Sequence, residues 1–263
     1  MQTSKVQLKN YECHYIYEDF GNLQTIVFSN SLGADLSMWD EQVEALKHRY
    51  NILRYDTRGH GKSSSPTAAY KVEDLRKDVL ELLNHLKLDK VVFCGLSMGG
   101  LIGQWLGIHH PNRFSHIVLA NTAAKIGNKQ GWNQRIQDVA DNGLESILKG
   151  TAERWFTEEF RENQKETVNK VLGVFTTTDL QGYINCCAVV RDADFTKQLH
   201  SLEVPVLVIS GVKDVVTTPD HGKYLEDKIP VASHLITYAA HLSNVEQACL
   251  FSNYILFFTQ EKH

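Results

Sequence analysis

The sequence lacks an excess of positive charge and any long apolar run. Its 263 residues carry 27 lysines and arginines against 31 aspartates and glutamates, a formal net charge of -4. Because nucleic acids bind basic surfaces, this balance argues against a nucleic-acid partner. No apolar run approaches the roughly 20 residues that cross a bilayer, which argues against a membrane protein.

Metal-ligand patterns are also missing. The five cysteines do not occur in the spaced pairs that bind zinc, and no two histidines have the H-x-x-x-H spacing. We therefore expect no metal and no cofactor, and we interpret the cysteines as reduced thiols. The first residues lack the apolar segment of a secretion signal and lead directly into an alternating stretch, so we expect a cytoplasmic protein.

A G-x-S-x-G pattern follows an apolar run at residues 91–96. The run predicts a buried strand, and a helix is predicted from there to about residue 109. In a nucleophile elbow the serine stands on so sharp a turn that Gly95 and Gly99 are needed two residues to either side. The backbone N–H of Met98 then faces developing negative charge at a helix N-terminus. The pattern predicts Ser97 as a nucleophile.

Short apolar runs alternate with helical stretches along most of the chain, which predicts a mostly parallel sheet with helices on both faces. Strands are expected near residues 6–8, 13–17, 25–29, 51–56, 91–96, 116–120, 204–211 and 234–238, and helices near residues 38–48, 72–86, 98–109 and 243–258. Between residues 121 and 202 only helical stretches occur. We therefore expect a core of residues 1–120 and 203–263 with a helical cap, residues 121–202, inserted into it.

Two candidate partners for Ser97 follow later strands. A serine hydroxyl needs a base to remove its proton, and the base needs a carboxylate to orient it. Asp214 follows the predicted strand at 204–211, and His241 follows the one at 234–238. Each alone is compatible with a turn or helix-capping role. Three such residues in the order serine, acid, histidine at three strand ends favour a catalytic triad.

The loops after two earlier strands contribute the remaining candidates. Leu32, after the strand at 25–29, is predicted to provide the second oxyanion N–H beside Met98. The glycine-rich loop at 57–66 matches neither phosphate-binding glycine motif, so we expect Arg58 to brace this loop rather than bind phosphate.

With these residues in place, the sequence resembles the α/β-hydrolase superfamily over nearly its whole length, and within it the 3-oxoadipate enol-lactonases. The more specific motifs are SNSLG at 29–33, RWFT at 154–157, CCA at 186–188, RDAD at 191–194 and AAHLSNVE at 239–246. The resemblance implies an α/β-hydrolase fold with an eight-stranded, mostly parallel sheet and an inserted helical cap. The chain departs from the pattern at Asn30-Ser31, where such hydrolases commonly have His-Gly.

The resemblance also implies a small-molecule lactone substrate and acyl transfer through Ser97 in the degradation of aromatic compounds. Such a substrate carries a free carboxylate, which is costly to bury without a partner. The candidate partners of this carboxylate are Arg135, Arg154 and Arg191. Trp132 and Trp155 are candidates for the walls of the substrate site, and the hydroxyl of Ser31 is a candidate contact to the substrate. Each of the cap residues taken singly fits a structural role better.

Other functions share the same motifs. A broad carboxylesterase or a cofactor-free perhydrolase of this fold would need the same triad, and a ligand-binding receptor that retains slow hydrolysis is a further alternative. The sequence leaves the oligomeric state open.

Overall fold

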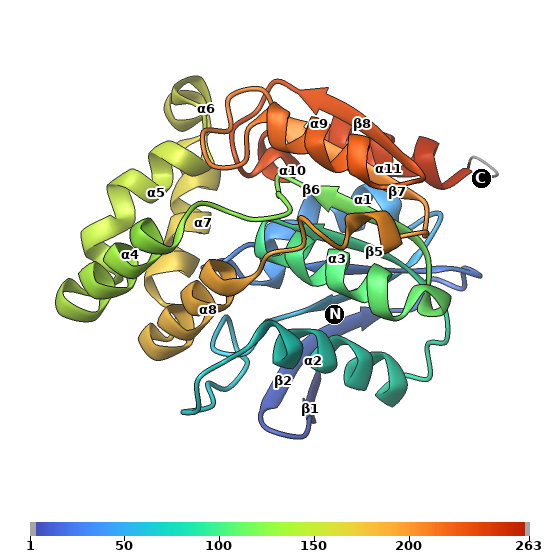
Figure 1. The fold of residues 1–263 in the computed structure, drawn as a ribbon, viewed down its shortest axis with the longest axis horizontal. Helices are drawn as coiled ribbons and strands as arrows, with labels where there is room; N and C mark the ends of the chain where they lie inside the picture. Colours follow the sequence, from blue (N-terminus) through green and yellow to red (C-terminus); the bar gives the residue numbers. More distant parts are fainter. Residues whose placement is uncertain (1–3, 261–263) are drawn as a thin grey trace.

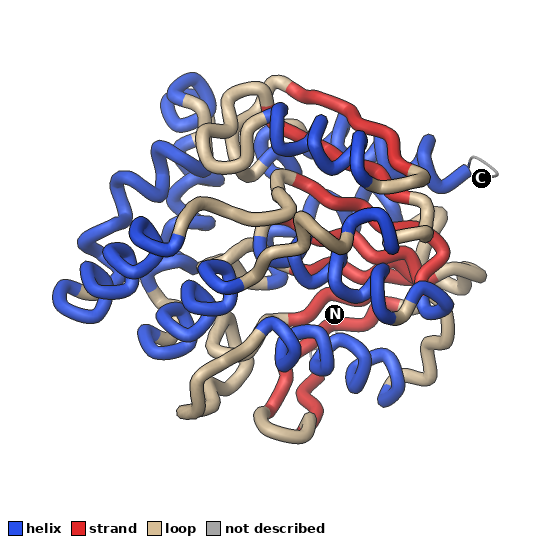
Figure 2. Tube along the Cα trace, viewed as in Figure 1, coloured by secondary structure: helices blue, strands red, loops and turns tan. Residues whose placement is uncertain are grey.

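The computed structural model describes residues 4–260, so the outermost three residues at each end of the predicted core lie outside the described residues. Over this range eight strands form one sheet in the order β1-β2-β4-β3-β5-β6-β7-β8. The strands are drawn as arrows in Figure 1 and in red in Figure 2. The strands are β1 (Ser4–Gln7), β2 (Glu12–Glu18), β3 (Thr25–Ser29), β4 (Asn51–Tyr55), β5 (Val91–Leu96), β6 (Phe114–Ala120), β7 (Val206–Gly211) and β8 (Ala232–Thr237).

The pairing of the strands confirms the mostly parallel sheet. β1 and β2 form an antiparallel hairpin at one edge, β2 pairs antiparallel with β4, and the strands from β4 to β8 are parallel. Every residue of β3, β4, β5 and β7 is buried, which explains why these strands are rich in apolar residues. β4 departs from this with Asn51 and Arg54, both of them buried and hydrogen-bonded.

Helices cover both faces of the sheet. α1 (Asp40–Leu46) packs against α11 (Ala248–Gln260), and α2 (Val72–His85) packs against α3 (Met98–His109) (Figure 1). The predicted helix at 38–48 is preceded by a 3-10 turn, Leu36–Trp39. The predicted helix at 243–258 is two helices, α10 (Ser243–Glu246) and α11, because the backbone of Gln247 leaves the helical conformation.

One helix was not predicted from the sequence. α9 (Pro219–Lys228) packs against β7 and β8, and Pro219 occupies its first turn, where proline is tolerated. Only Gly222 and Leu225 of this helix are buried, so its sequence has too few apolar residues to produce a helical period.

The stretch between β6 and β7 is helical, as predicted. Its helices are α4 (Lys129–Asn142), α5 (Leu148–Trp155), α6 (Glu158–Asn163), α7 (Lys165–Thr176) and α8 (Leu180–Asp192), with a 3-10 turn at Leu144–Ile147. They gather at one end of the molecule, on the left in Figure 1. None of the helices described over residues 4–260 is long and apolar enough to cross a membrane.

The strand order explains where a site can form. The chain passes from β3 outward to β4 and then returns to β5 on the other side of β3, so the direction of winding reverses between β3 and β5. In open parallel sheets a crevice opens at such a reversal, beyond the carboxyl ends of the strands. The loops after β3 and β5 carry Leu32 and Ser97.

Candidate active site

Ser97 lies on a strained turn between β5 and α3. Its φ of 56° and ψ of -110° lie outside the conformations that serine normally adopts. A Cβ added to Gly95 would lie 2.1 Å from the carbonyl oxygen of Gly99, and one added to Gly99 would lie 2.2 Å from that of Ser29. Only glycine fits at both positions, as the elbow pattern predicts.

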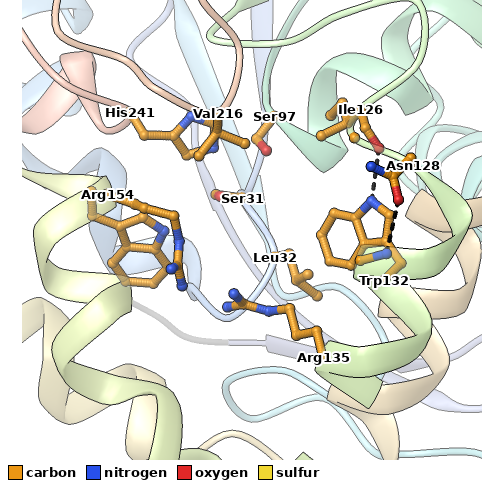
Figure 3. A pocket seen from close by; sticks show the side chains of 13 residues that line it. Ser31, Leu32, Ser97, Ile126, Asn128, Trp132, Arg135, Arg154, Val216 and His241 are labelled. Carbon is orange, nitrogen blue, oxygen red and sulfur yellow. Dashed lines mark hydrogen bonds between the residues drawn. The ribbon is translucent and has the colours of Figure 1, made fainter. Parts of the chain in front are cut away.

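The other two candidates for the triad are hydrogen-bonded to each other. His241 Nδ1 lies 2.8 Å from Asp214 Oδ2, and both side chains are buried. Since Nδ1 is engaged with the carboxylate, Nε2 is the nitrogen left to accept a proton from Ser97. Ser97 and His241 line the same cavity (Figure 3).

Asp214 is held as a carboxylate by several donors. The backbone N–H groups of Val216 and Thr217 donate to Oδ1, and the Thr217 hydroxyl donates to Oδ2 at 2.7 Å. Burial alone would raise the pKa of Asp214, but His241, the amide of Asn121 and the N–H of Thr217 hold that pKa well below its usual range. An ionised carboxylate at this distance from His241 is suited to stabilise a positive charge on its ring.

The loop after β3 is fixed from several sides. Asn30 donates from Nδ2 to the carbonyl of Tyr55 at 3.0 Å and accepts at Oδ1 from Trp39 Nε1 at 2.9 Å. Its own carbonyl accepts from Gly99 N. These contacts fix the position of Asn30, and they bind the candidate oxyanion loop to the elbow.

His60 holds the other end of that loop. Its Nε2 accepts a hydrogen bond from the N–H of Gly33 at 2.9 Å, and burial lowers its pKa, which keeps the ring neutral. Leu32, between these fixed points, lines the cavity. Met98 is the first residue of α3; it does not line the cavity, so its candidate role depends on its backbone N–H.

The cavity measures about 290 Å³ and lies between the strand ends and the helices of residues 121–202. Eight predicted residues line it: Ser31, Leu32, Ser97, Trp132, Arg135, Arg154, Trp155 and His241. Residues that the sequence did not indicate complete the lining: Ile126, Gly127, Asn128, Gly131 and Val216. Across residues 4–260, no group of three or more metal-binding side chains is arranged to hold an ion.

Two guanidinium groups point into this cavity opposite Ser97 and His241 (Figure 3). Arg135 donates to the hydroxyl of Tyr183 at 2.6 and 2.8 Å, and Arg154 donates to that of Thr151 at 3.1 Å. No carboxylate within residues 4–260 forms an ion pair with either one. Burial, together with the like charge of Arg135, lowers the pKa of Arg154. This part of the cavity is therefore positively charged and able to accept an anion.

Arg191 lies elsewhere. Its guanidinium makes two hydrogen bonds to its neighbour Asp192 and one to Asn133, and the residue does not line the cavity. The structure thus brings two of the three candidate arginines together and leaves the third at the surface of the helical region.

Arg58 has the bracing role that the sequence predicts. Its guanidinium makes a two-pronged ion pair with Asp78 of α2, at 2.7 and 2.6 Å, and lies over the rings of Tyr11 and Tyr70. Both members of the pair are buried. The pair fixes the loop after β4 to α2, away from the cavity.

Comparison with known proteins agrees with this geometry. A family model described as alpha/beta hydrolase fold matches residues 24–248. The chain belongs to the α/β-hydrolase family. This α/β hydrolase is 44% identical over 239 residues to 3-oxoadipate enol-lactonase 2 of Acinetobacter baylyi, covering 90% of each protein. It is 42% identical over 226 residues to 3-oxoadipate enol-lactonase 1 of the same organism, covering 86% of this chain and 85% of the relative.

A solved structure extends the likeness to three dimensions. The crystal structure of the enol-lactonase from Burkholderia xenovorans LB400 is 39% identical in sequence and matches with a TM-score of 0.96, covering 98% of this hydrolase and 100% of that chain. The resemblance predicted from the motifs is therefore confirmed.

Proposed function

We propose that this α/β hydrolase opens the lactone ring of 3-oxoadipate enol-lactone to give 3-oxoadipate. Two relatives carry that name, and the observation in this chain that supports it most directly is the pair Arg135 and Arg154. Both reach into the cavity of Ser97 and His241 without a carboxylate partner of their own. A substrate with a free carboxylate would supply the missing anion.

The proposed reaction proceeds through an acyl-serine. His241 Nε2 takes the proton of Ser97 as the oxygen bonds to the lactone carbonyl carbon, and the N–H groups of Leu32 and Met98 stabilise the resulting oxyanion. The ring C–O bond then breaks, and the imidazolium protonates the leaving enol oxygen. The enol tautomerises to a ketone.

Water completes the cycle. His241 removes a proton from a water molecule, whose oxygen attacks the acyl carbon. The bond between that carbon and Ser97 Oγ then breaks, and the imidazolium returns the proton to this oxygen. The acid that is released loses a proton to solvent and leaves as a carboxylate. Asp214 remains ionised throughout and stabilises the imidazolium in both half-reactions.

We further propose that residues 121–202 act as a cap over a core of residues 1–120 and 203–263. In support, Trp132, Arg135, Arg154 and Trp155 from this region form one wall of the cavity. The five free thiols, four of them buried, support the expected cytoplasmic location.

The experiment that tests the function compares two substrates. Purified protein is assayed with enzymatically generated enol-lactone and with p-nitrophenyl acetate, with Ser97→Ala as the control. We expect rapid loss of the lactone, slow loss of the ester, and no turnover of either by the variant. Ester turnover without a preference for the lactone would instead favour the broad carboxylesterase.

A further inference from the structure

The carboxyl end of β6 contacts every part of the proposed triad. The carbonyl of Ala120 accepts a hydrogen bond from Ser97 N at 2.9 Å, and the hydroxyl of Thr122 donates to the carbonyl of Ser97 at 2.8 Å. These two residues hold the nucleophile turn from both sides. Asn121, between them, faces the other two members of the triad.

The amide of Asn121 bridges the acid and the loop of the base. Nδ2 donates to Asp214 Oδ2 at 3.0 Å and to the carbonyl of Ala240, the residue before His241, at 3.2 Å. Oδ1 accepts from the hydroxyl of Ser243, two residues after His241. The side chain is fully buried, and both of its ends are hydrogen-bonded.

The backbone conformation of Asn121 determines the direction in which its side chain points. Asn121 has a φ of 43°, in the left-handed region that asparagine enters more readily than most residues, and its N–H donates to the carbonyl of Ile209 in β7 at 2.8 Å. The chain therefore turns sharply as it leaves β6. The turn directs the amide across the end of β7, where Asp214 lies.

We propose that Asn121 is a positioning residue that keeps the acid and the base of the triad aligned. Asp214 Oδ2 already binds His241 Nδ1 and the hydroxyl of Thr217, and the amide of Asn121 is a third partner on the same oxygen that further limits rotation of the carboxylate. The bond to Ala240 fixes the backbone from which the imidazole extends. The amide of Asn121 thus fixes the position of both Asp214 and the backbone beside His241. The inference rests on the proposed triad but not on the identity of the substrate.

The first test removes the amide without straining the backbone. In Asn121→Gly, glycine adopts the positive φ freely, so a change in rate reports on the lost hydrogen bonds. Because acid–base catalysis and not binding is affected, we expect kcat to fall about 10- to 100-fold with KM unchanged. The low-field proton resonance of His241 Nδ1 should move or broaden. Use of p-nitrophenyl acetate keeps this result independent of whether the enol-lactone is the substrate.

The second test preserves the shape of the side chain. The carboxyl of Asn121→Asp can donate to Asp214 only while it is protonated, and once ionised it repels that carboxylate. The titratable groups facing this position are Asp214 and His241. We expect kcat of Asn121→Asp to fall as pH rises through the ionisation of the new carboxyl, a descending limb that the wild type lacks.

Asn51 provides a matched control. It is a second buried asparagine, and it lies at the start of β4, at the end of the sheet opposite to Asn121. Its amide is also hydrogen-bonded at both ends: Nδ2 donates to the carbonyl of Asn22, and Oδ1 accepts from the N–H of Phe20. Asn51→Gly and Asn51→Asp should lower Tm without changing kcat per folded molecule, the pH profile or the His241 resonance.

Three outcomes would overturn the proposal. The first is an unchanged kcat in Asn121→Gly, and the second is a wild-type pH profile in Asn121→Asp. The third is a fall in kcat that accompanies the fall in Tm equally in the Asn121 and the Asn51 variants. If Asn121→Gly does not fold, the pH profile of Asn121→Asp decides alone.

Discussion

At the scale of single residues, the elbow tolerates no added atom. In Gly99→Ala the new Cβ would lie 2.2 Å from the carbonyl oxygen of Ser29, the last residue of β3. The candidate oxyanion loop, which carries Leu32, begins directly after Ser29. Relief of this clash therefore moves that loop away from Ser97. We expect a loss of roughly 1–3 kcal/mol in the free energy of unfolding, and a fall in kcat of at least about 10-fold. Urea unfolding and ester turnover measure the two effects.

Gly173→Ala is the matched control for this substitution. Gly173 lies within α7, and a Cβ there would meet nothing within 4 Å. Alanine is the better helix former, so we expect a gain of about 0.5–1 kcal/mol and unchanged kcat. Equal stability changes in the two variants would contradict the crowding argument.

The two cavity arginines allow a test of charge recognition. In Arg135→Gln the cavity loses a cation, so we expect KM for the enol-lactone to rise about 10- to 100-fold and KM for uncharged p-nitrophenyl acetate to stay nearly constant. Steady-state kinetics on both substrates measure the split. Arg191→Gln, outside the cavity, should change neither value. Equal increases for the lactone and the ester would exclude a carboxylate contact.

Sequence patterns predict some of these residues better than others. Ser97, Asp214 and His241 each follow a strand in a fixed order, and parallel strands bring their carboxyl ends to one edge. Arg135 and Arg191 could not be distinguished, because the rotation of each helix about its axis decides which side chain reaches the cavity. Asn121 also follows a strand, but a single asparagine there is equally typical of a turn.

At the scale of elements, α10 joins the loop that carries His241 to the helices of residues 121–202. Glu246, its last residue, accepts at Oε1 from the N–H and the hydroxyl of Thr157, at 2.6 and 2.9 Å, and at Oε2 from the N–H of Ala240 at 2.5 Å. The backbone adds two further bonds, from His241 N to the carbonyl of Arg154 and from Leu242 N to that of Trp155. The end of α5 is thus fixed to the loop that carries the base.

Glu246→Gln tests this connection. A glutamine has one acceptor oxygen, so its NH₂ group would face either Thr157 or the N–H of Ala240, and one buried donor would lose its partner. We expect a loss of roughly 1–3 kcal/mol in stability and a lower kcat on both substrates, because Ala240 adjoins His241. Glu159→Gln, at an exposed position in α6, is the control. Wild-type Tm and kcat in Glu246→Gln would show that the connection is dispensable.

At the scale of the whole molecule, the sequence predicts which strands exist but not which are neighbours. Most of the buried strands are apolar runs in the sequence, and nothing in such a run specifies that β3 lies between β4 and β5. The order of the strands was therefore not predicted from the sequence. The contacts between the helices of residues 121–202 and the sheet were likewise not predictable, because they depend on surfaces that only the folded helices create.

One of those contacts joins two backbones. Gly182 of α8 lies against Gly59 of the loop after β4, and a Cβ on Gly182 would come within 2.5 Å of the Cα of Gly59. The next residue, Tyr183, accepts both short hydrogen bonds from Arg135. The distance between α8 and the loop therefore affects the position of a cavity guanidinium.

Gly182→Ala should act at a distance from the proposed chemistry. The added methyl moves α8 away from the loop, Tyr183 moves with it, and Arg135 loses its alignment toward the cavity. The hydrogen bonds described for Ser97, Asp214 and His241 involve none of these groups, so we expect KM for the enol-lactone to rise while kcat on p-nitrophenyl acetate stays near the wild-type value. Kinetics on both substrates, with Gly173→Ala beside them, measure this. A parallel loss on the ester would mean that α8 acts on the triad itself, and Arg135 would then not be the link between this contact and the substrate.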